Sequence, residues 1–258
     1  MGTLLATPDH HDRMDRAGRA AALTLAHVAA RLAPGMATAD IDALVRAHTA
    51  SLCGTPSQLG YHGFPAAVCV SPNHVVCHGI PSPHERLADG DIVNVDVTTG
   101  LDGFHGDTSA TFVIGRASPD ALHVVDVARR CRDLGVAMIR PGLRLGDLGA
   151  AIDELARREG CSVVRDFGGH GIGRAMHEPP HVPYVGRAGT GPRLRPGMAI
   201  TIEPMINLGR PDVVLLADGW TVVTADGSLS AQFEHTVRVT HDGHVVTTRL
   251  HPTADVAP

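Results

Sequence analysis

Apolar residues recur at helical spacing in two segments of the chain, and a Pro-Gly pair follows each segment. In the first segment they are spaced four, three and four positions apart, as on one face of an α-helix. These residues are Ala21, Leu25, Val28 and Leu32, and those that we assign to one face of a second helix are Leu122, Val125, Cys131 and Met138. A further apolar series follows the second Pro-Gly pair, at Leu145, Leu148, Ile152 and Leu155. Each region therefore predicts two helices joined by a Pro-Gly turn.

The two regions belong to a longer internal repeat. Residues 87–96 and 194–203 both begin with Leu, carry Gly at the fourth position and end with an acid after an apolar stretch. They lie 107 positions apart, and the same offset relates Pro34-Gly35 to Pro141-Gly142. We interpret this as an internal duplication, with halves at about residues 13–115 and 120–250, rather than a chance similarity between segments rich in Gly and acids. Two such units most simply form one pseudo-symmetric α+β domain over residues 1–258.

Four acidic residues lie in or beside β-branched, apolar runs that predict strands. The runs are residues 92–97, 108–114, 200–206 and 233–239, and the acids are Asp96, Asp107, Glu203 and Glu234. Aspartate is poorly suited to strands, and burying a carboxylate is costly unless a cation pairs with it. The chain has no lysine, and Arg238 is the only arginine in these four runs. Metal ions are the simplest partners for the four carboxylates; the alternative is that each acid faces water or caps a turn.

Composition and charge exclude several other classes of protein. Of the 258 residues, 43% are hydrophobic and 19% are charged, which is typical of a globular chain. The net charge of −5 argues against nucleic-acid binding, and no apolar run is long enough to span a membrane. The five cysteines form no Cys-x-x-Cys pair, and the first residues show no signal-peptide pattern. These features predict a cytoplasmic protein with reduced thiols and with neither a membrane nor a nucleic-acid partner.

A histidine ligand is expected beside four carboxylates, and Gly168–Gly173 offers His170 in a Gly-rich loop where the backbone can approach a site closely. Hard oxygen ligands with one imidazole suit two divalent ions, such as Co, Mn, Fe or Zn, better than a single structural zinc. His177-Glu-Pro-Pro-His181 matches the His-Glu-x-x-His pattern of single-zinc proteases. That pattern needs a helix, which Pro179 and Pro180 prevent, so we exclude it.

In chain order, the five candidate ligands resemble those of type I methionine aminopeptidases. The residues are Asp96, Asp107, His170, Glu203 and Glu234, separated by 11, 63, 33 and 31 positions. The motifs around them are Asn94-Val-Asp-Val, Gly103-Phe-His-Gly-Asp-Thr, Gly169-His-Gly-Ile-Gly, Thr201-Ile-Glu-Pro-Met and Gln232-Phe-Glu-His-Thr. Three more motifs of the same family are Tyr61-His-Gly-Phe-Pro, Val76-Cys-His-Gly-Ile-Pro and Met176-His-Glu-Pro-Pro. The resemblance covers about residues 12–250, and the short interval between His170 and Glu203 favours type I over type II.

The resemblance implies the pita-bread fold, in which two pseudo-symmetric α-β halves hold two divalent metal ions on a curved antiparallel sheet. Asp96 would chelate one ion with both carboxylate oxygens. Asp107 and Glu234 would bridge the two ions, and His170 and Glu203 would complete the other. The resemblance therefore implies a dinuclear metal centre, without indicating which ion is used in the cell.

The activity implied by the resemblance is metal-dependent removal of the initiator methionine from nascent polypeptides whose second residue is small. The implied catalytic residues are Glu203 as proton acceptor, His177 as a donor to the oxyanion, and His78, which would hydrogen-bond the backbone nitrogen of the second residue or assist the leaving amine. The implied substrate-binding residues are Tyr61, Phe64, Cys69, His78, Met176, His177 and Trp220. Bacterial members of the family commonly carry Cys, Tyr and Phe where this chain has Gln58, Phe64 and Met176, which leaves the substrate range open.

We expect the protein to be a monomer that acts on emerging polypeptides, including those at the ribosome. One alternative is a proline-specific aminopeptidase or dipeptidase of the same fold, which usually carries a further N-terminal domain. Only 95 residues precede Asp96 in this chain. The other alternative is a non-catalytic pita-bread binding protein, a class that loses metal ligands, whereas all five are present in this sequence.

Overall fold

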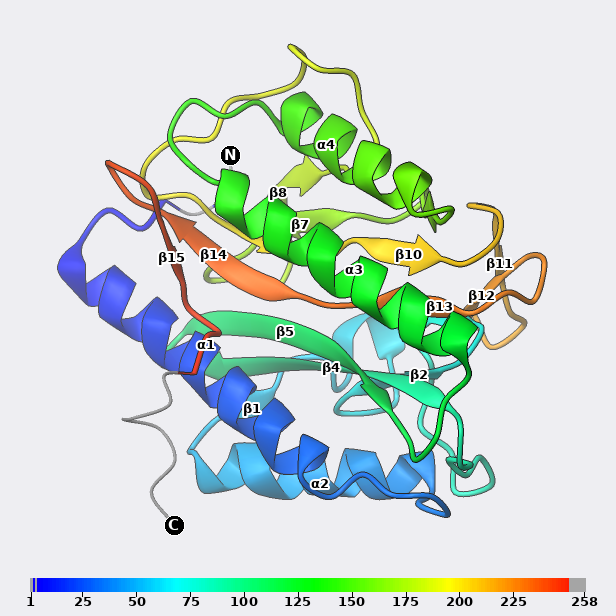
Figure 1. The fold of residues 1–258 in the computed structure, drawn as a ribbon. Coiled ribbons are helices and arrows are strands. Elements are labelled where there is room, and N and C mark those ends of the chain that lie inside the picture. Colours follow the sequence, from blue (N-terminus) through cyan, green and yellow to red (C-terminus); the bar gives the residue numbers. More distant parts are fainter. Residues whose placement is uncertain (1, 3, 251–258) are drawn as a thin grey trace.

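Two pairs of helices lie against a set of curved antiparallel sheets (Figure 1). The computed structural model describes residue 2 and residues 4–250. One pair is α1 (Pro8–Ala29) with α2 (Thr38–Ser51), and the other is α3 (Pro119–Met138) with α4 (Leu145–Arg158). α1 packs on β4 (Ile92–Leu101) and β5 (Phe104–Val113), whereas α3 packs on β10 (Met205–Asn207) and β13 (Ser230–Gln232). The predicted α+β arrangement is confirmed.

The long helix of each pair begins with a proline that directly follows an N-cap residue. The Thr7 hydroxyl accepts a hydrogen bond from the backbone N–H of His10 (3.2 Å), and Ser118 accepts one from Ala121 (3.2 Å). Pro8 and Pro119 follow these caps, where a proline costs no intrahelical hydrogen bond. Both helices end shortly before a Pro-Gly pair, as the sequence predicts.

The apolar face that we assigned to the helix over residues 122–138 is only partly confirmed. Cys131 is buried as predicted, and Val125 and Met138 pack against the core while partly buried, but Leu122 is 50% exposed. The core-facing residues that the assignment missed are Ala121, Val124, Val127, Ala128 and Val136. Small residues such as the two alanines allow a helix to pack closely on a sheet. The face predicted for the following helix is confirmed, because Leu145, Leu148 and Ile152 are buried.

The described residues form four antiparallel sheets. The first orders β1 (Thr55–Pro56), β4 and β2 (Cys69–Pro72), with β5 also beside β4. The second orders β15 (His244–Val246), β14 (His235–Val239), β9 (Ala199–Ile202), β7 (Gly169–Gly171) and β8 (Glu178–Val182). The two smaller sheets are β13-β10-β6, with β6 at Ser162–Val163, and β11-β12-β3, with the bounds Val213–Leu215, Val222–Thr224 and Val75–Cys77.

Three segments differ from their predicted secondary structure. The apolar run 200–206 is divided into β9 and β10 at Glu203, before Pro204, and the run 233–239 forms β14 only from His235 onward. The segment Gly168–Gly173, predicted as a loop, contains the short strand β7. In each case the observed strand differs from the predicted one at a candidate metal ligand. An acid or a histidine there needs a side-chain direction that a regular, uninterrupted strand does not give.

The internal repeat reappears in the hydrogen bonding. The backbone N–H of Gly35 donates to Leu87 O (2.7 Å), and that of Gly142 donates to Leu194 O (2.9 Å). The isolated bridge between Ala37 and Arg86 likewise has a counterpart between Arg144 and Arg193. Every one of these pairs is displaced by the same 107 positions that relate the two sequence segments.

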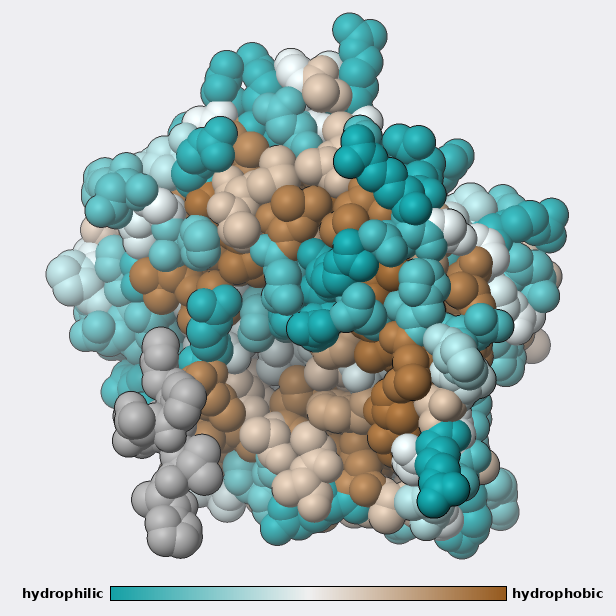
Figure 2. Space-filling model, in the orientation of Figure 1, coloured by the Kyte–Doolittle hydropathy of each residue, from teal (hydrophilic) through white to brown (hydrophobic). Residues whose placement is uncertain are grey.

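Each half also has an apolar core of its own. One cluster of buried residues includes Leu25, Ile41 and Val95, between α1, α2 and β4. The larger cluster lies between α3, α4 and the second sheet. On the face shown in Figure 2, hydrophilic side chains protrude around the outline, and hydrophobic ones lie between them. None of the helices described is long and apolar enough to cross a membrane.

Candidate active site

The hairpin of β4 and β5 brings two of the predicted acids together. Its two-residue turn, Asp102-Gly103, has φ values of 52° and 77°, in the left-handed region that a tight type I′ hairpin requires. The resulting register pairs Asp96 with Ser109 and Thr98 with Asp107, so that Asp96 and Asp107 are diagonal neighbours on one face. The Thr98 hydroxyl donates to Asp107 Oδ1 over 2.8 Å and fixes the direction of that carboxylate.

The antiparallel pairing of β9 and β10 with β14 and β13 brings the other two acids together where these strands are interrupted. Ile202 pairs with His235 on one side of the break, and Met205 pairs with Gln232 on the other. This common register leaves Glu203 and Glu234 facing one another where both strands are interrupted. Both side chains are buried, with exposed fractions of 7% and 1%.

Mostly side-chain hydrogen bonds, rather than a continuous backbone ladder, join the β4–β5 hairpin to β14 and to the residues before it. The Thr236 hydroxyl donates to Asp107 O (2.8 Å) and accepts from Asp107 N–H (3.0 Å). The Thr108 hydroxyl donates to Glu234 O, and the Glu234 N–H donates to Ser109 O. The two halves of the repeat therefore meet where the four carboxylates lie.

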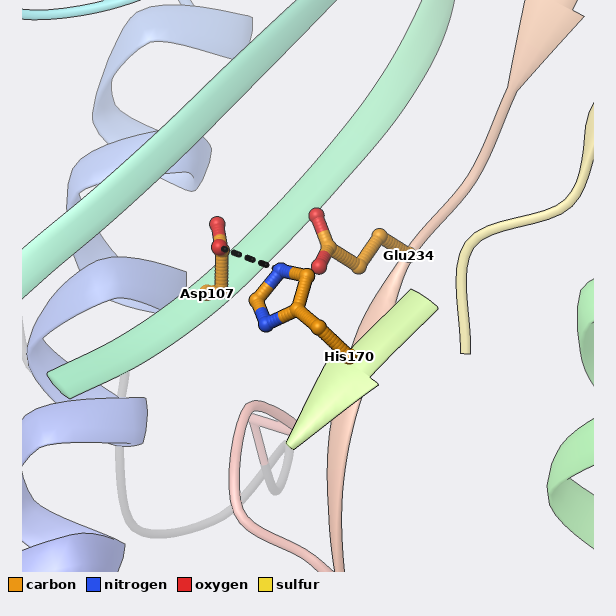
Figure 3. Close-up of side chains that lie close together, drawn as sticks. All are labelled: Asp107, His170 and Glu234. Carbon is orange, nitrogen blue, oxygen red and sulfur yellow. Dashed lines mark ion pairs between the residues drawn. The ribbon is translucent and has the colours of Figure 1, made fainter. Parts of the chain in front are cut away.

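His170 projects from β7 towards these acids (Figure 3). Its Nε2 is 3.8 Å from Asp107 Oδ2 and 3.5 Å from Glu203 Oε1. Its Nδ1 lies 3.0 Å from Gly171 O, so Nδ1 carries the proton and Nε2 presents a lone pair to the carboxylates. Burial, with His177 nearby, lowers the pKa of His170 to about 3, which keeps the imidazole in its neutral, metal-binding form.

The four carboxylates strongly favour a bound cation. Burial raises the pKa of Asp107 to about 6 and, with the charge of Asp107, that of Glu203 to about 8. The pKa values of Asp96 and Glu234 are raised well above the usual range by burial and by the neighbouring acids. Asp96 Oδ1 and Glu234 Oε1 are buried without a hydrogen-bond partner in the structure. Asp107, His170 and Glu234 offer ligand atoms within 4.8 Å of one another, so the donors present fit a divalent metal.

Several residues that support the acids were not predicted from the sequence. Glu203 accepts hydrogen bonds from the Thr201 hydroxyl (2.6 Å) and the Gln232 side-chain amide (3.1 Å). The buried Tyr184 hydroxyl accepts from Glu203 N–H and donates to Thr201 O. Thr98 and Thr201 each lie two positions from a predicted acid. Because alternate residues of a strand face the same side, this spacing could have indicated that the two threonines lie beside the acids.

A cavity of about 570 Å³ opens beside the acids and is lined by every candidate site residue. Its apolar side contains Phe64, Cys69 and Trp220, with the Phe64 and Trp220 rings in an edge-to-face contact at 5.1 Å. Met176 is buried, and Tyr61 stands partly exposed. Gln58 is also buried and lines this wall.

Two histidines lie between the acids and this pocket. His78 has a φ of 57°, a strained conformation for a residue with a side chain, and its ring contacts Phe167 edge-to-face. His177 Nδ1 is 2.8 Å from the Tyr61 hydroxyl, and its ring centroid is 4.2 Å from that of His170. Burial lowers the pKa of both histidines, that of His177 to about 4, so both rings are neutral at pH 7. A neutral imidazole can still donate one hydrogen bond to a substrate.

The His-Glu-x-x-His pattern of residues 177–181 does not lie on a helix, as the sequence predicts. His177 precedes β8, and His181 lies within this strand rather than on a helix. His181 pairs with His170 across the sheet, and both line the cavity. The two histidines of the motif therefore do not share a helical face, as its two prolines indicate.

Comparisons with known proteins agree with this geometry. Residues 12–241 match metallopeptidase family M24. "Methionine aminopeptidase A" of a Synechocystis species is 49% identical over 90% of this chain and 92% of the relative. The methionine aminopeptidase of Escherichia coli is 43% identical over 94% of this chain and 92% of the relative.

Solved structures distinguish two groups with this fold. The crystal structure of methionine aminopeptidase from Rickettsia prowazekii superposes with a TM-score of 0.94 at 44% identity, covering 96% of this chain and all of that one. Prolidase from Pyrococcus furiosus superposes with a TM-score of 0.76 at 18% identity. This chain covers 66% of that prolidase, and because only 18% of the residues are identical, the likeness concerns the fold alone.

Proposed function

Because the chain belongs to metallopeptidase family M24 and is a methionine aminopeptidase, which removes the initiator methionine of polypeptides, we propose that its cavity residues perform this hydrolysis with two divalent ions. The observation that carries the assignment of the site is the convergence of four buried carboxylates and one neutral imidazole. They line a cavity of about 570 Å³ whose wall also contains apolar side chains. These features support the pita-bread dinuclear centre predicted above.

The ligands would be divided between two ions. Asp96 would hold one ion, His170 and Glu203 the other, and Asp107 and Glu234 would bridge them. The cluster formed by Asp107, His170 and Glu234 supports this division, as does the unpartnered oxygen of Asp96. The bound ions would lower the pKa of a water nucleophile and polarise the scissile carbonyl. Co, Mn, Fe and Zn all suit these ligands, and availability in the cell decides among them.

The protein's own groups would move the protons and hold the substrate. Glu203 would take a proton from the water nucleophile, with its carboxylate oriented by Thr201 and Gln232. His177 would donate to the oxyanion that develops on the scissile carbonyl, with its ring held by the Tyr61 hydroxyl. His78 would contact the backbone nitrogen of the second substrate residue, where its unusual backbone conformation directs the ring.

The apolar pocket would select an unbranched first side chain. Phe64, Cys69 and Trp220 form a slot in which a thioether gains sulfur–aromatic contacts of about 0.3–1.5 kcal/mol. A charged first residue would lose its hydration there without a partner. Although Phe64 and Met176 replace residues common in bacterial relatives, both are apolar and buried, which supports a methionine preference.

A peptide panel that varies the first two residues tests this specificity. We expect Met-Gly and Met-Ala peptides to be cut, Met-Lys hardly at all, and norleucine to replace Met nearly as well, because both side chains are straight and similar in size. Leu and Val at the first position should be rejected by shape. The measurement is kcat/KM for each peptide. Preference for Leu over Met would contradict the assignment, as would a preference for Pro at the second position regardless of the first.

The remaining expectations about the whole protein are also proposals. Five free cysteines, four of them buried, support a reducing compartment such as the cytoplasm. Action at the ribosome and a monomeric state follow only from the family resemblance. The common hydrogen-bond offset supports one duplicated domain, although residues 1, 3 and 251–258 of the predicted range 1–258 lie outside the described part.

A further inference from the structure

Gln58 is a buried polar residue in a pocket wall whose neighbouring side chains, Phe64, Cys69 and Trp220, are apolar. A polar group in this position would ordinarily be read as a hydrogen-bonding contact for the substrate. The hydrogen bonds of Gln58 indicate a different role, because both ends of its side-chain amide are directed at the backbone of β4.

The edge of β4 has a gap at this point. β2 pairs with β4 only as far as Asp96, and β1 pairs with it only at Thr99 and Gly100. The Ser57 N–H donates to Thr98 O (2.9 Å), and the Thr98 N–H, two positions beyond the last residue that β2 pairs, is left facing the pocket wall. Buried backbone groups of this kind are costly to leave unpaired.

The side chain of Gln58 fills this gap as a peptide group of a neighbouring strand would. Its Nε2 donates to Asp96 O over 2.9 Å, and its Oε1 accepts from Thr98 N–H over 3.4 Å. Nε2 also lies 3.8 Å from Cys69 Sγ on β2. The amide thus links β1 and β2 across the interval where neither strand reaches β4.

This arrangement acts on the metal site through two residues. Asp96 is a proposed ligand, and Thr98 orients the carboxylate of Asp107 through a hydrogen bond of 2.8 Å. Gln58 holds the backbone of both Asp96 and Thr98. Its amide oxygen and nitrogen are both engaged by β4, so they are not free to bind a polar group of the substrate.

We propose that Gln58 is a positioning residue for the metal ligands Asp96 and Asp107, and not a determinant of which first residue is accepted. The proposal rests on the proposed function in one respect, namely that these acids hold metal. Partners that orient ligands typically change metal affinity or activity by about 10–100-fold when they are removed.

Two substitutions separate the hydrogen bonds from the volume of the side chain. Gln58→Met keeps the length and removes both hydrogen bonds, whereas Gln58→Asn keeps the amide but is one methylene too short to reach both partners. Leu59→Ala, at the exposed neighbouring position, is the matched control for disturbance of the loop. Each folded protein would be titrated with Mn²⁺ or Co²⁺ by calorimetry, and its peptide panel compared with that of the wild type.

We expect both Gln58 variants to bind the metal at least about tenfold more weakly, with faster hydrogen exchange at the Thr98 amide and an unchanged ranking of first residues. Leu59→Ala should match the wild type. Wild-type metal affinity in Gln58→Met would overturn the proposal, and so would an altered ranking of first residues at unchanged affinity.

Two further observations keep this test independent of folding and of the proposed function. In the metal-free wild type, the Thr98 amide should exchange slowly, and fast exchange there would overturn the proposal even if neither Gln58 variant folds. If the wild type binds metal but releases no methionine, the proposed function fails, while the effect of Gln58 on affinity is still measured.

Discussion

Replacing either Asp107 or Glu234 with alanine is expected to reduce methionine release to background. Each of these carboxylates would bridge the two ions, so its loss affects both binding sites at once. Both side chains are buried, and no other described carboxylate of the cluster can take their place without moving its strand. The measurements are initial rates with Met-Ala peptides and metal content after dialysis, for which we expect a substantial loss of bound metal in both variants.

Thermal unfolding distinguishes this explanation from simple misfolding. In the wild type, added Mn²⁺ or Co²⁺ should raise Tm, because the ion binds only the folded state. Asp107→Ala should lose this increase, while its metal-free Tm stays near or above that of the wild type, since one buried and repelling carboxylate has been removed. Glu154→Ala, an exposed carboxylate on α4, is the control and should behave as wild type. An undiminished metal-induced increase in Asp107→Ala would contradict the bridging role.

Alanine at His78 or His177 is expected to lower kcat by about 10²-fold or more while leaving the metal in place. Both rings line the cavity, and the positions that we assign to the metal ligands do not include them. His177 is held at Nδ1 by the Tyr61 hydroxyl, so its other nitrogen is available for the substrate. Steady-state kinetics and metal analysis on the same preparations provide the test. A loss of bound metal that matches the loss of rate would reassign the histidine as a ligand.

The acids of the site could be predicted from the sequence alone because each one is recognised from its immediate neighbours in the chain. An acid inside a β-branched run conflicts with its surroundings, and four such conflicts in a chain without lysine indicate a missing cation. The helix pairs were predictable for the same reason, since Pro-Gly turns and apolar spacing are read within a few residues. The repeat added long-range information, because Asp96 and Glu203 occupy equivalent positions of two copies.

Contacts between distant segments could not be predicted in this way. Thr236 joins Asp107 across 129 positions, and Asn94 donates to Gln232 O across 138. Such threonines and asparagines look like ordinary strand residues until the strands of the two halves are brought together. The interruption at Glu203 is likewise set by the pairing with β13 and β14 and by the adjoining Pro204, not by the apolar pattern, which runs through it.

The misassigned position on α3 and the role of Gln58 have a common origin. Leu122 was assigned to the core face, although its neighbour Ala121, together with Ala128, is buried there. Gln58 was compared with pocket residues of relatives, although its side chain acts as part of a sheet edge. In both cases the identity of a residue was less informative than the space and the backbone groups around it.

The central claim is that this chain releases an N-terminal methionine only with divalent metal bound to the buried carboxylates. The most direct test follows free methionine released from a Met-Ala peptide by chelator-treated, dialysed protein, before and after stepwise addition of Co²⁺ or Mn²⁺. We predict background release from the metal-free protein and recovery of activity that is complete when about two ions have been bound per chain. Full activity of the metal-free protein would contradict the account.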